Sequence, residues 1–281
     1  MPIQVFTGTR GFTQMKAAFK KNWKHYLQEA LGLGIFMLSA CFFSAMIFSE
    51  EGSWHHVLSP VMRNVLMGIA MGSTALFIFY SPFTSPSGSQ INPAVTLAFL
   101  RMGKMCRYDA LFFALFQIIG GTVAVFIMQL IMGSILIDPP VNSAVTVPGK
   151  FGAAWASITE FIIAFVTMMM VLFTSNNDEM KKFTRIFAGC LVCTWVIVAG
   201  PISGFGMNPA RSLASAVPAN IWTAFWIYLF IPFAGMLLAV EVYLAIQRIK
   251  RNNPHSSKVK SGPESYRRSK NDLLEPLEYL L

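Results

Sequence analysis

Two copies of one tripeptide constrain this chain most: Asn92-Pro93-Ala94 and Asn208-Pro209-Ala210. Each tripeptide opens an apolar run of about ten residues, which as a helix rises roughly 15 Å, or half of the ~30 Å hydrocarbon core of a bilayer. A helix of that length cannot cross a membrane alone. Two such half-helices, one in each half of an apolar chain, indicate segments that enter a membrane from opposite sides and meet near its middle.

The composition supports a membrane setting. Hydrophobic residues make up 54% of the 281 residues and charged residues 12%, whereas soluble domains carry about 25% charge. We therefore expect an all-α, multi-pass integral membrane protein with six full spans besides the two half-helices. The charge-poor segments that predict the spans are 27–48, 62–83, 108–136, 153–174, 184–203 and 221–246.

The basic residues predict the orientation. If both termini are cytoplasmic, 19 of the 22 Lys and Arg lie in the inner segments, and only Arg63, Lys150 and Arg211 lie outside. This asymmetry is the positive-inside pattern, so the formal charge of +9 reflects topology. Nucleic-acid binding, the other interpretation of a basic chain, lacks a soluble domain to carry it. No small-residue cleavage site follows the first basic residues, so we expect a cytoplasmic lead-in rather than a signal peptide.

The two halves of the chain repeat each other. Glu29 opens the first span and Glu160 lies in the fourth, and each is followed by two more spans, with a tripeptide just before the third helix of its half. Three spans per half is an odd number, so the halves must be inverted relative to each other. The expected division is a cytoplasmic segment at 1–25, a channel domain at 26–248 with repeats at about 26–137 and 150–248, and a polar, disordered cytoplasmic tail at 249–281.

The tripeptide has a physical role at the start of a helix. Asparagine is a favoured N-cap and proline suits the first helical position, so Asn92 and Asn208 would cap the half-helices and present their amides to a pore. The turn-rich stretches 85–90 and 200–206 are tolerated at membrane depth only if they are buried or line a wet cavity. The converging positive helix ends would repel cations while water passes by exchanging hydrogen bonds.

The motifs around the tripeptides resemble one known family. They read Ser87-Gly88-Ser89-Gln90-Ile91-Asn92-Pro93-Ala94-Val95-Thr96 and Ser203-Gly204-Phe205-Gly206-Met207-Asn208-Pro209-Ala210-Arg211-Ser212. Over about residues 25–248 the chain resembles the major intrinsic proteins, the aquaporins and aquaglyceroporins. The resemblance implies a homotetramer in which every subunit has its own pore. It also implies that Glu29 and Glu160 support the re-entrant loops, with a proton relay as the alternative for buried carboxylates.

The resemblance also implies a selectivity filter. Arg211 occupies the family's filter-arginine position, and counting back from Asn208 places Phe205 and Val196 in the filter. The position from the second span is Met71 or Gly72. A Gly68–Gly72 pair is typical of close helix crossing, which favours Met71.

This filter differs from that of strict water channels, which resemble one another in having a histidine where this chain has Val196. The four histidines here are His25, His55, His56 and His255, and none lies in an expected span. Gln90 stands where a histidine usually precedes the first tripeptide. Other features, such as Ser212 in place of an aspartate, are those of water channels, so the filter is mixed.

We therefore expect a passive channel for water, through a filter wider and less polar than the strict type, with leakage of glycerol, urea, ammonia or hydrogen peroxide. The alternatives are a glycerol-type facilitator and a structural membrane protein with a closed pore. A coupled transporter would need carboxylates beside Asn92 or Asn208, and an enzyme would need a nucleophile–base or metal cluster. Neither is visible, so we expect no cofactor and no metal, and Cys190 and Cys193 are expected to serve packing. The plasma membrane is the expected location.

Overall fold

A computed structural model describes residues 8–252, and the described chain is helical with no strand. Nine α-helices follow one another: α1 (Gly8–Phe48), α2 (Pro60–Tyr80), α3 (Pro93–Arg101), α4 (Arg107–Met132), α5 (Ser134–Ile137), α6 (Gly152–Ser175), α7 (Thr184–Ser203), α8 (Pro209–Ala219) and α9 (Phe225–Asn252). Residues 1–7 and 253–281 lie outside the described residues, and with them most of the tail for which we expected disorder.

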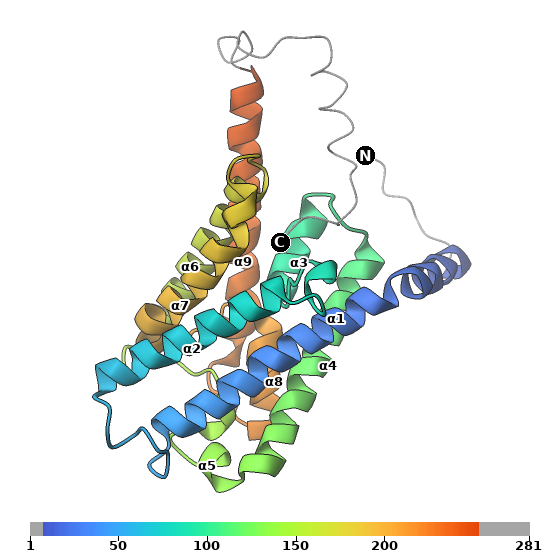
Figure 1. Cartoon of the computed structure of the whole chain (residues 1–281). Helices are drawn as coiled ribbons and strands as arrows, with labels where there is room; N and C mark the ends of the chain where they lie inside the picture. Colours follow the sequence, from blue (N-terminus) through green and yellow to red (C-terminus); the bar gives the residue numbers. More distant parts are fainter. Residues whose placement is uncertain (1–7, 253–281) are drawn as a thin grey trace.

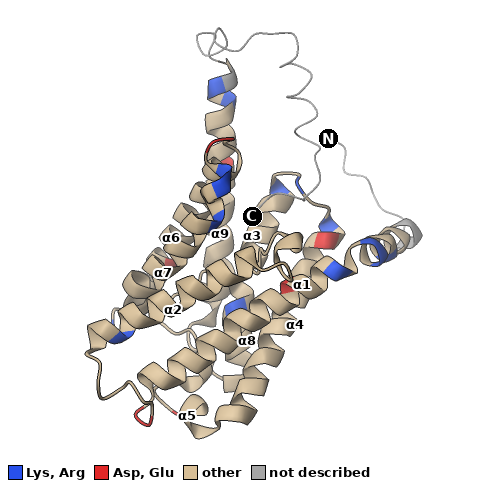
Figure 2. Cartoon of the chain, viewed as in Figure 1, with Lys and Arg blue, Asp and Glu red and all other residues tan. Residues whose placement is uncertain are grey.

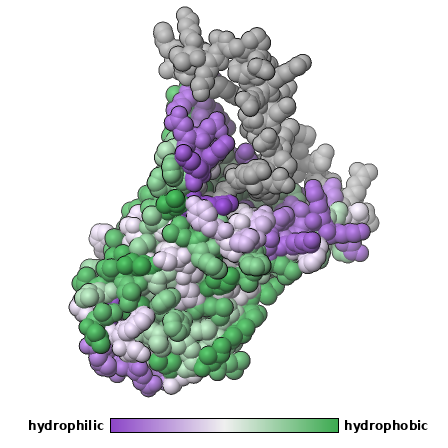
Figure 3. Space-filling model, in the orientation of Figure 1, coloured by the Kyte–Doolittle hydropathy of each residue, from purple (hydrophilic) through white to green (hydrophobic). Residues whose placement is uncertain are grey.

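Six of the described helices are long and apolar enough to cross a membrane: α1, α2, α4, α6, α7 and α9. Figure 3 shows apolar side chains over the middle of the molecule and hydrophilic ones toward its two ends. Figure 2 shows most of the charged positions near helix ends and in loops. The six expected spans are thus confirmed, and α3 and α8 are the two half-helices.

The packing of the helices repeats between the halves of the chain (Figure 1). Within the first half α1 packs along α4, and within the second half α6 packs along α9. The halves join where α2 crosses α7, where α3 packs on α9, and where α8 packs on α4. Each half-helix therefore lies against the last long helix of the opposite half, as an inverted repeat requires.

The first helix differs from its expected boundary. The first span was expected at 27–48, but α1 runs without a break from Gly8 to Phe48, so the expected lead-in is helical from Gly8 onward. Aromatic packing continues along this extension, because the ring of Phe19 lies 5.2 Å from that of Phe112 on α4 and 5.8 Å from that of Tyr26. At 1.5 Å per residue the helix is about 60 Å long, roughly twice the hydrocarbon thickness.

Three other helix ends differ from the expected spans. The third span ends at Met132 rather than at 136, because Gly133 adopts a φ of +56° and starts the short helix α5. The second span ends at Tyr80, three residues early, where Ser81 is the C-cap. The last span continues to Asn252, so residues 249–252 belong to α9 and not to the tail.

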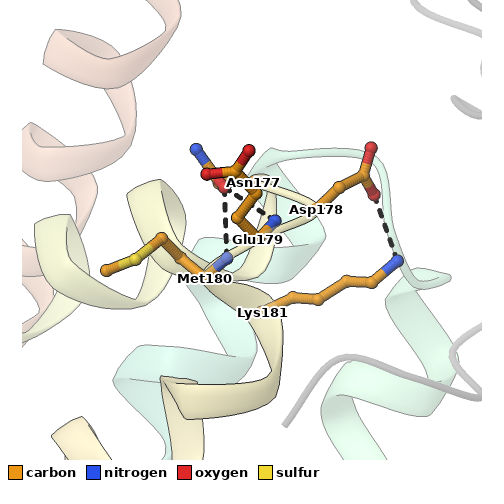
Figure 4. Close-up of polar contacts among 5 residues, drawn as sticks. All are labelled: Asn177, Asp178, Glu179, Met180 and Lys181. Atoms are coloured by element: carbon orange, nitrogen blue, oxygen red, sulfur yellow. Dashed lines mark hydrogen bonds and ion pairs between the residues drawn. The ribbon is translucent and has the colours of Figure 1, made fainter.

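A tight turn connects α6 to α7 (Figure 4). The side-chain oxygen of Asn177 accepts hydrogen bonds from the backbone N–H groups of Glu179 and Met180, at 3.0 and 3.1 Å. Asparagine commonly closes turns in this way. Lys181 pairs with Asp178 at 3.1 Å, and both side chains are exposed, so this pair contributes little stability.

Glycines allow α2 and α7 to cross closely. A side chain at Gly72 would begin 2.7 Å from the Cβ of Cys193 and 3.1 Å from the carbonyl oxygen of Gly189, and one at Gly68 would clash with Ile197. Gly189 in turn faces Leu76 at a distance that leaves no room for a methyl group. Small residues at such a crossing let the backbones approach, which confirms the role expected for the Gly68–Gly72 pair.

Gly72→Val should therefore destabilise the fold. Overpacking typically costs about 1–3 kcal/mol, which for a protein of this size lowers Tm by roughly 2–10 °C. The measurement is thermal unfolding in detergent. Ser73→Val is the matched control, because Ser73 is the next residue and is exposed. Equal Tm values for the two variants would contradict the close crossing.

Candidate functional site

The two segments before the half-helices share an unusual backbone. Gly88, Ser89 and Ile91 have φ values of +90°, +45° and +42°. The residues 116 positions later, Gly204, Phe205 and Met207, have φ values of +78°, +52° and +47°. The left-handed region is costly for residues other than glycine, most of all for a β-branched one such as isoleucine. Such conformations persist only where surrounding contacts hold them.

Glu29 supplies those contacts in the first half. Its carboxylate is fully buried and accepts four hydrogen bonds. The donors are the N–H groups of Gln90 at 3.0 Å and Ile91 at 2.6 Å, the hydroxyl of Ser87 at 2.6 Å and the amide of Gln117 at 2.8 Å. The side chain thus ties α1 and α4 to the loop that precedes α3.

Glu160 does the same in the second half. It is also fully buried and accepts from the N–H groups of Gly206 at 2.8 Å and Met207 at 2.5 Å, and from the Ser203 hydroxyl at 2.6 Å. A side chain at Gly206 would begin 2.5 Å from the ring of Tyr228 and 3.1 Å from the Glu160 carboxylate, so only glycine fits there. Both glutamates contact loops, as expected for a supporting role.

The asparagines cap the half-helices as predicted. The side-chain oxygen of Asn92 accepts from the N–H of Ala94 at 2.9 Å, and that of Asn208 accepts from those of Ala210 and Arg211 at 3.0 and 3.2 Å. Both caps have extended backbones, and proline follows each at the first helical position.

The side-chain amide of each cap donates a hydrogen bond to the opposite half of the chain. Asn92 donates to the carbonyl oxygen of Met207 at 3.0 Å, and Asn208 donates to that of Ile91 at 2.6 Å. These reciprocal bonds bring the N-termini of α3 and α8 together. An asparagine amide has two N–H donors, so one N–H of each remains beyond this bond. The sequence predicted that the amides act as donors but not that each holds the opposite loop.

A cavity of about 330 Å³ lies on one side of this junction. Its wall includes all four residues favoured for the filter: Met71, Val196, Phe205 and Arg211. Gly72 is absent from the lining and instead faces Cys193 on α7. Of these two residues only Met71 has a side chain at this cavity.

Arg211 is nearly buried, with 9% of its surface exposed. Its guanidinium donates to the hydroxyl of Thr146, which belongs to the segment between α5 and α6. The guanidinium has five N–H donors, so a single hydroxyl leaves most of them for other partners. The arginine is thereby held at the cavity wall, and its remaining N–H groups can donate hydrogen bonds to the oxygen of a passing molecule.

A second cavity of about 80 Å³ continues on the other side. Asn92, Asn208 and Gln90 line it, and Phe36, Phe205 and Arg211 line both cavities. The two cavities therefore share Phe205 and Arg211 of the expected filter, and the asparagine pair lines the smaller one. Adjacent cavities with a shared wall are what a narrow path through the bundle requires.

Several residues of the site were missed from the sequence. Gln117 binds Glu29, Thr146 binds Arg211, and the Tyr228 hydroxyl donates to the carbonyl oxygen of Ser203 at 2.7 Å. Gln117 carried a signal, since it is an amide in the middle of an apolar span. Nothing in the sequence distinguishes Thr146 and Tyr228 from other loop or helix residues. Among residues 8–252 no group of three His, Cys, Asp or Glu could hold a metal ion.

The family model described as Major intrinsic protein matches residues 16–243. Among curated proteins, Aquaporin NIP1-4 of Oryza sativa subsp. japonica is 32% identical over 183 residues, which is 64% of each chain. Aquaporin NIP1-2 of Arabidopsis thaliana is 33% identical over 63% of this chain and 62% of its own length. The matches therefore span somewhat less than two thirds of these relatives.

A solved structure shares the fold. The aquaglyceroporin from Plasmodium falciparum superposes with a TM-score of 0.65 over 78% of this chain and 94% of its own. The sequence identity is 19%, so this likeness concerns the architecture alone. It confirms a bundle of six spans with two re-entrant half-helices.

Replacement of the buried glutamates tests their role. In Glu29→Gln or Glu160→Gln an amide NH₂ replaces one oxygen that accepts from N–H groups, which should cost about 1–3 kcal/mol or more and lower Tm in detergent. Glu241→Gln is the control, since Glu241 makes a half-exposed ion pair with Arg101 at 2.7 Å, worth about 0–1 kcal/mol. Unchanged Tm together with a changed proton permeability would favour the proton relay instead.

Proposed function

Since the chain belongs to the major intrinsic protein family, we propose that it is a passive channel for water that also admits small neutral solutes and excludes protons and ions. The observation that carries this proposal is a pair of cavities that share Phe36, Phe205 and Arg211 in their walls, the smaller of them lined by the linked Asn92 and Asn208. Plant aquaporins among the relatives support it.

The geometry suggests how water would pass. The free N–H groups of Asn92 and Asn208 and the guanidinium of Arg211 donate to the oxygen of a permeating molecule. The N-termini of α3 and α8 each carry about half a positive charge. Two such ends beside a cationic arginine oppose hydronium and other cations, while a neutral molecule exchanges one hydrogen bond for the next. The first residues of the two half-helices keep the asparagines in register. These residues are Pro93 and Ala94 in α3 and Pro209 and Ala210 in α8.

The filter favours a channel that is not restricted to water. Val196 gives the cavity an apolar wall where a histidine would narrow it and add a donor. Glycerol, urea, ammonia and hydrogen peroxide are candidate permeants. The second candidate function is a glycerol-type facilitator. Phe205 and the size of the larger cavity, about 330 Å³, favour it. A structural membrane protein with a closed pore is the third candidate.

The assembly and setting are part of the same proposal. We propose a homotetramer with one pore in each subunit, embedded in the plasma membrane with both termini in the cytoplasm. The charge asymmetry supports the orientation, since Lys104, Lys181 and Lys182 lie in loops on the side assigned to the cytoplasm. The channel domain would span about 26–248, and no cofactor is needed for passive conduction.

The test is stopped-flow light scattering on proteoliposomes, with sucrose and glycerol gradients in parallel. The proposal predicts shrinkage in sucrose much faster than in protein-free vesicles, with slower glycerol re-entry. Glycerol re-entry as fast as the water efflux would favour the facilitator. Shrinkage no faster than in protein-free vesicles would contradict a channel.

The filter assignment has its own test. Val196→His should raise the ratio of water to glycerol permeability, because the imidazole narrows the cavity and replaces an apolar wall with a polar one. Val198→His is the control, since Val198 is exposed on the outside of α7 and lines neither cavity. A ratio that does not change in Val196→His would show that Val196 is outside the filter.

A further inference from the structure

The Gln90 side chain is buried without a partner. It is 4% exposed, and neither its amide nitrogen nor its carbonyl oxygen has a hydrogen-bond partner among residues 8–252. Its backbone N–H is bound by Glu29, so the residue itself is firmly placed. A buried amide without partners is costly, and a bound molecule is one explanation for such a group in a native protein.

The position of Gln90 shows where that molecule would be. Gln90 lines the cavity of about 80 Å³ beside the asparagine pair. Most of the lining is apolar and comes from α2, α3, α6 and α7: Ala75, Phe79, Val95, Val171, Ala188 and Val192. A molecule that leaves the asparagines on this side therefore meets an amide in an otherwise apolar passage.

The other side-chain oxygens of this wall are already engaged. The carbonyl oxygens of Asn92 and Asn208 accept from backbone N–H groups. The hydroxyl of Thr167 accepts from the Trp195 ring at 2.9 Å and contacts the sulfur of Met207. Gln90 thus offers the cavity a side-chain oxygen and an NH₂ group that no other described residue occupies.

We propose that the Gln90 carboxamide is a binding station for the permeant and makes the channel prefer urea-like amides to polyols. The proposal rests on the channel function above and names a solute class for it. A carboxamide presents a donor and an acceptor side by side. Urea presents the same pair in the complementary order, so the two can form two parallel hydrogen bonds, whereas a glycerol hydroxyl must use one oxygen for both roles.

The size of the cavity agrees with this preference. About 80 Å³ corresponds to two or three water molecules at roughly 30 Å³ each. Urea has four heavy atoms and glycerol has six, so the smaller, planar molecule fits the station better. The asparagine N–H groups can hold the urea oxygen on one side while Gln90 holds its N–H on the other.

The experiment compares urea, glycerol and water permeability in proteoliposomes of wild type and Gln90→Met. Methionine is unbranched and of similar length but cannot form these hydrogen bonds. We expect the ratio of urea to glycerol permeability to fall at least about fivefold, the effect of one or two lost hydrogen bonds. Gln28→Leu is the control, since Gln28 binds His25 and lines neither pore cavity.

The outcomes separate this inference from the channel proposal. Two outcomes would overturn the proposed role of Gln90 and leave the channel proposal intact. One is a wild type that conducts water but shows a urea flux equal to that of bare lipid. The other is a Gln90→Met variant with an unchanged ratio of urea to glycerol permeability. A wild type that conducts nothing overturns both. If Gln90→Met has a lowered Tm in detergent, Gln90→Leu repeats the comparison, and the same loss of urea preference is required of it.

Discussion

Two buried carboxylates, Glu29 and Glu160, hold the rest of the structure in place. Each accepts hydrogen bonds from two successive backbone N–H groups in a loop whose residues include left-handed conformations. An irregular backbone in the interior of a membrane protein must have its polar groups satisfied internally. Because the glutamates lie on spanning helices, α1 and α6, they connect the strained loops to the rigid part of the bundle.

The asparagine pair depends on these loops. Ile91 and Met207 donate their backbone N–H groups to Glu29 and Glu160, respectively. Their carbonyl oxygens accept hydrogen bonds from the side-chain amides of Asn208 and Asn92. One residue in each loop therefore joins the carboxylate of its own half to the cap of the other half. The same residues line the cavity of about 80 Å³, and Arg211, three residues beyond the second cap, lines both cavities.

Much of the fold could be predicted from the sequence, because apolar length and the repeated tripeptide are strong local signals. The charge-poor segments predicted the spans, and Asn92 and Asn208 predicted the half-helices and their caps. The supporting role of Glu29 and Glu160 was expected from the family resemblance. The predicted helix ends were less accurate where a single backbone angle decides them, as at Gly133. The Thr146–Arg211 bond and the unpartnered Gln90 amide could not be predicted, because both depend on where distant segments meet in space.

The most direct test of the account measures water and proton permeability in the same proteoliposomes, with a pH-sensitive dye enclosed during stopped-flow mixing. The converging helix ends and Arg211 should let water pass and stop protons. We predict osmotic water permeability far above that of protein-free vesicles, with proton permeability equal to theirs. Water flux accompanied by a matching rise in proton flux, or no water flux at all, would contradict the account.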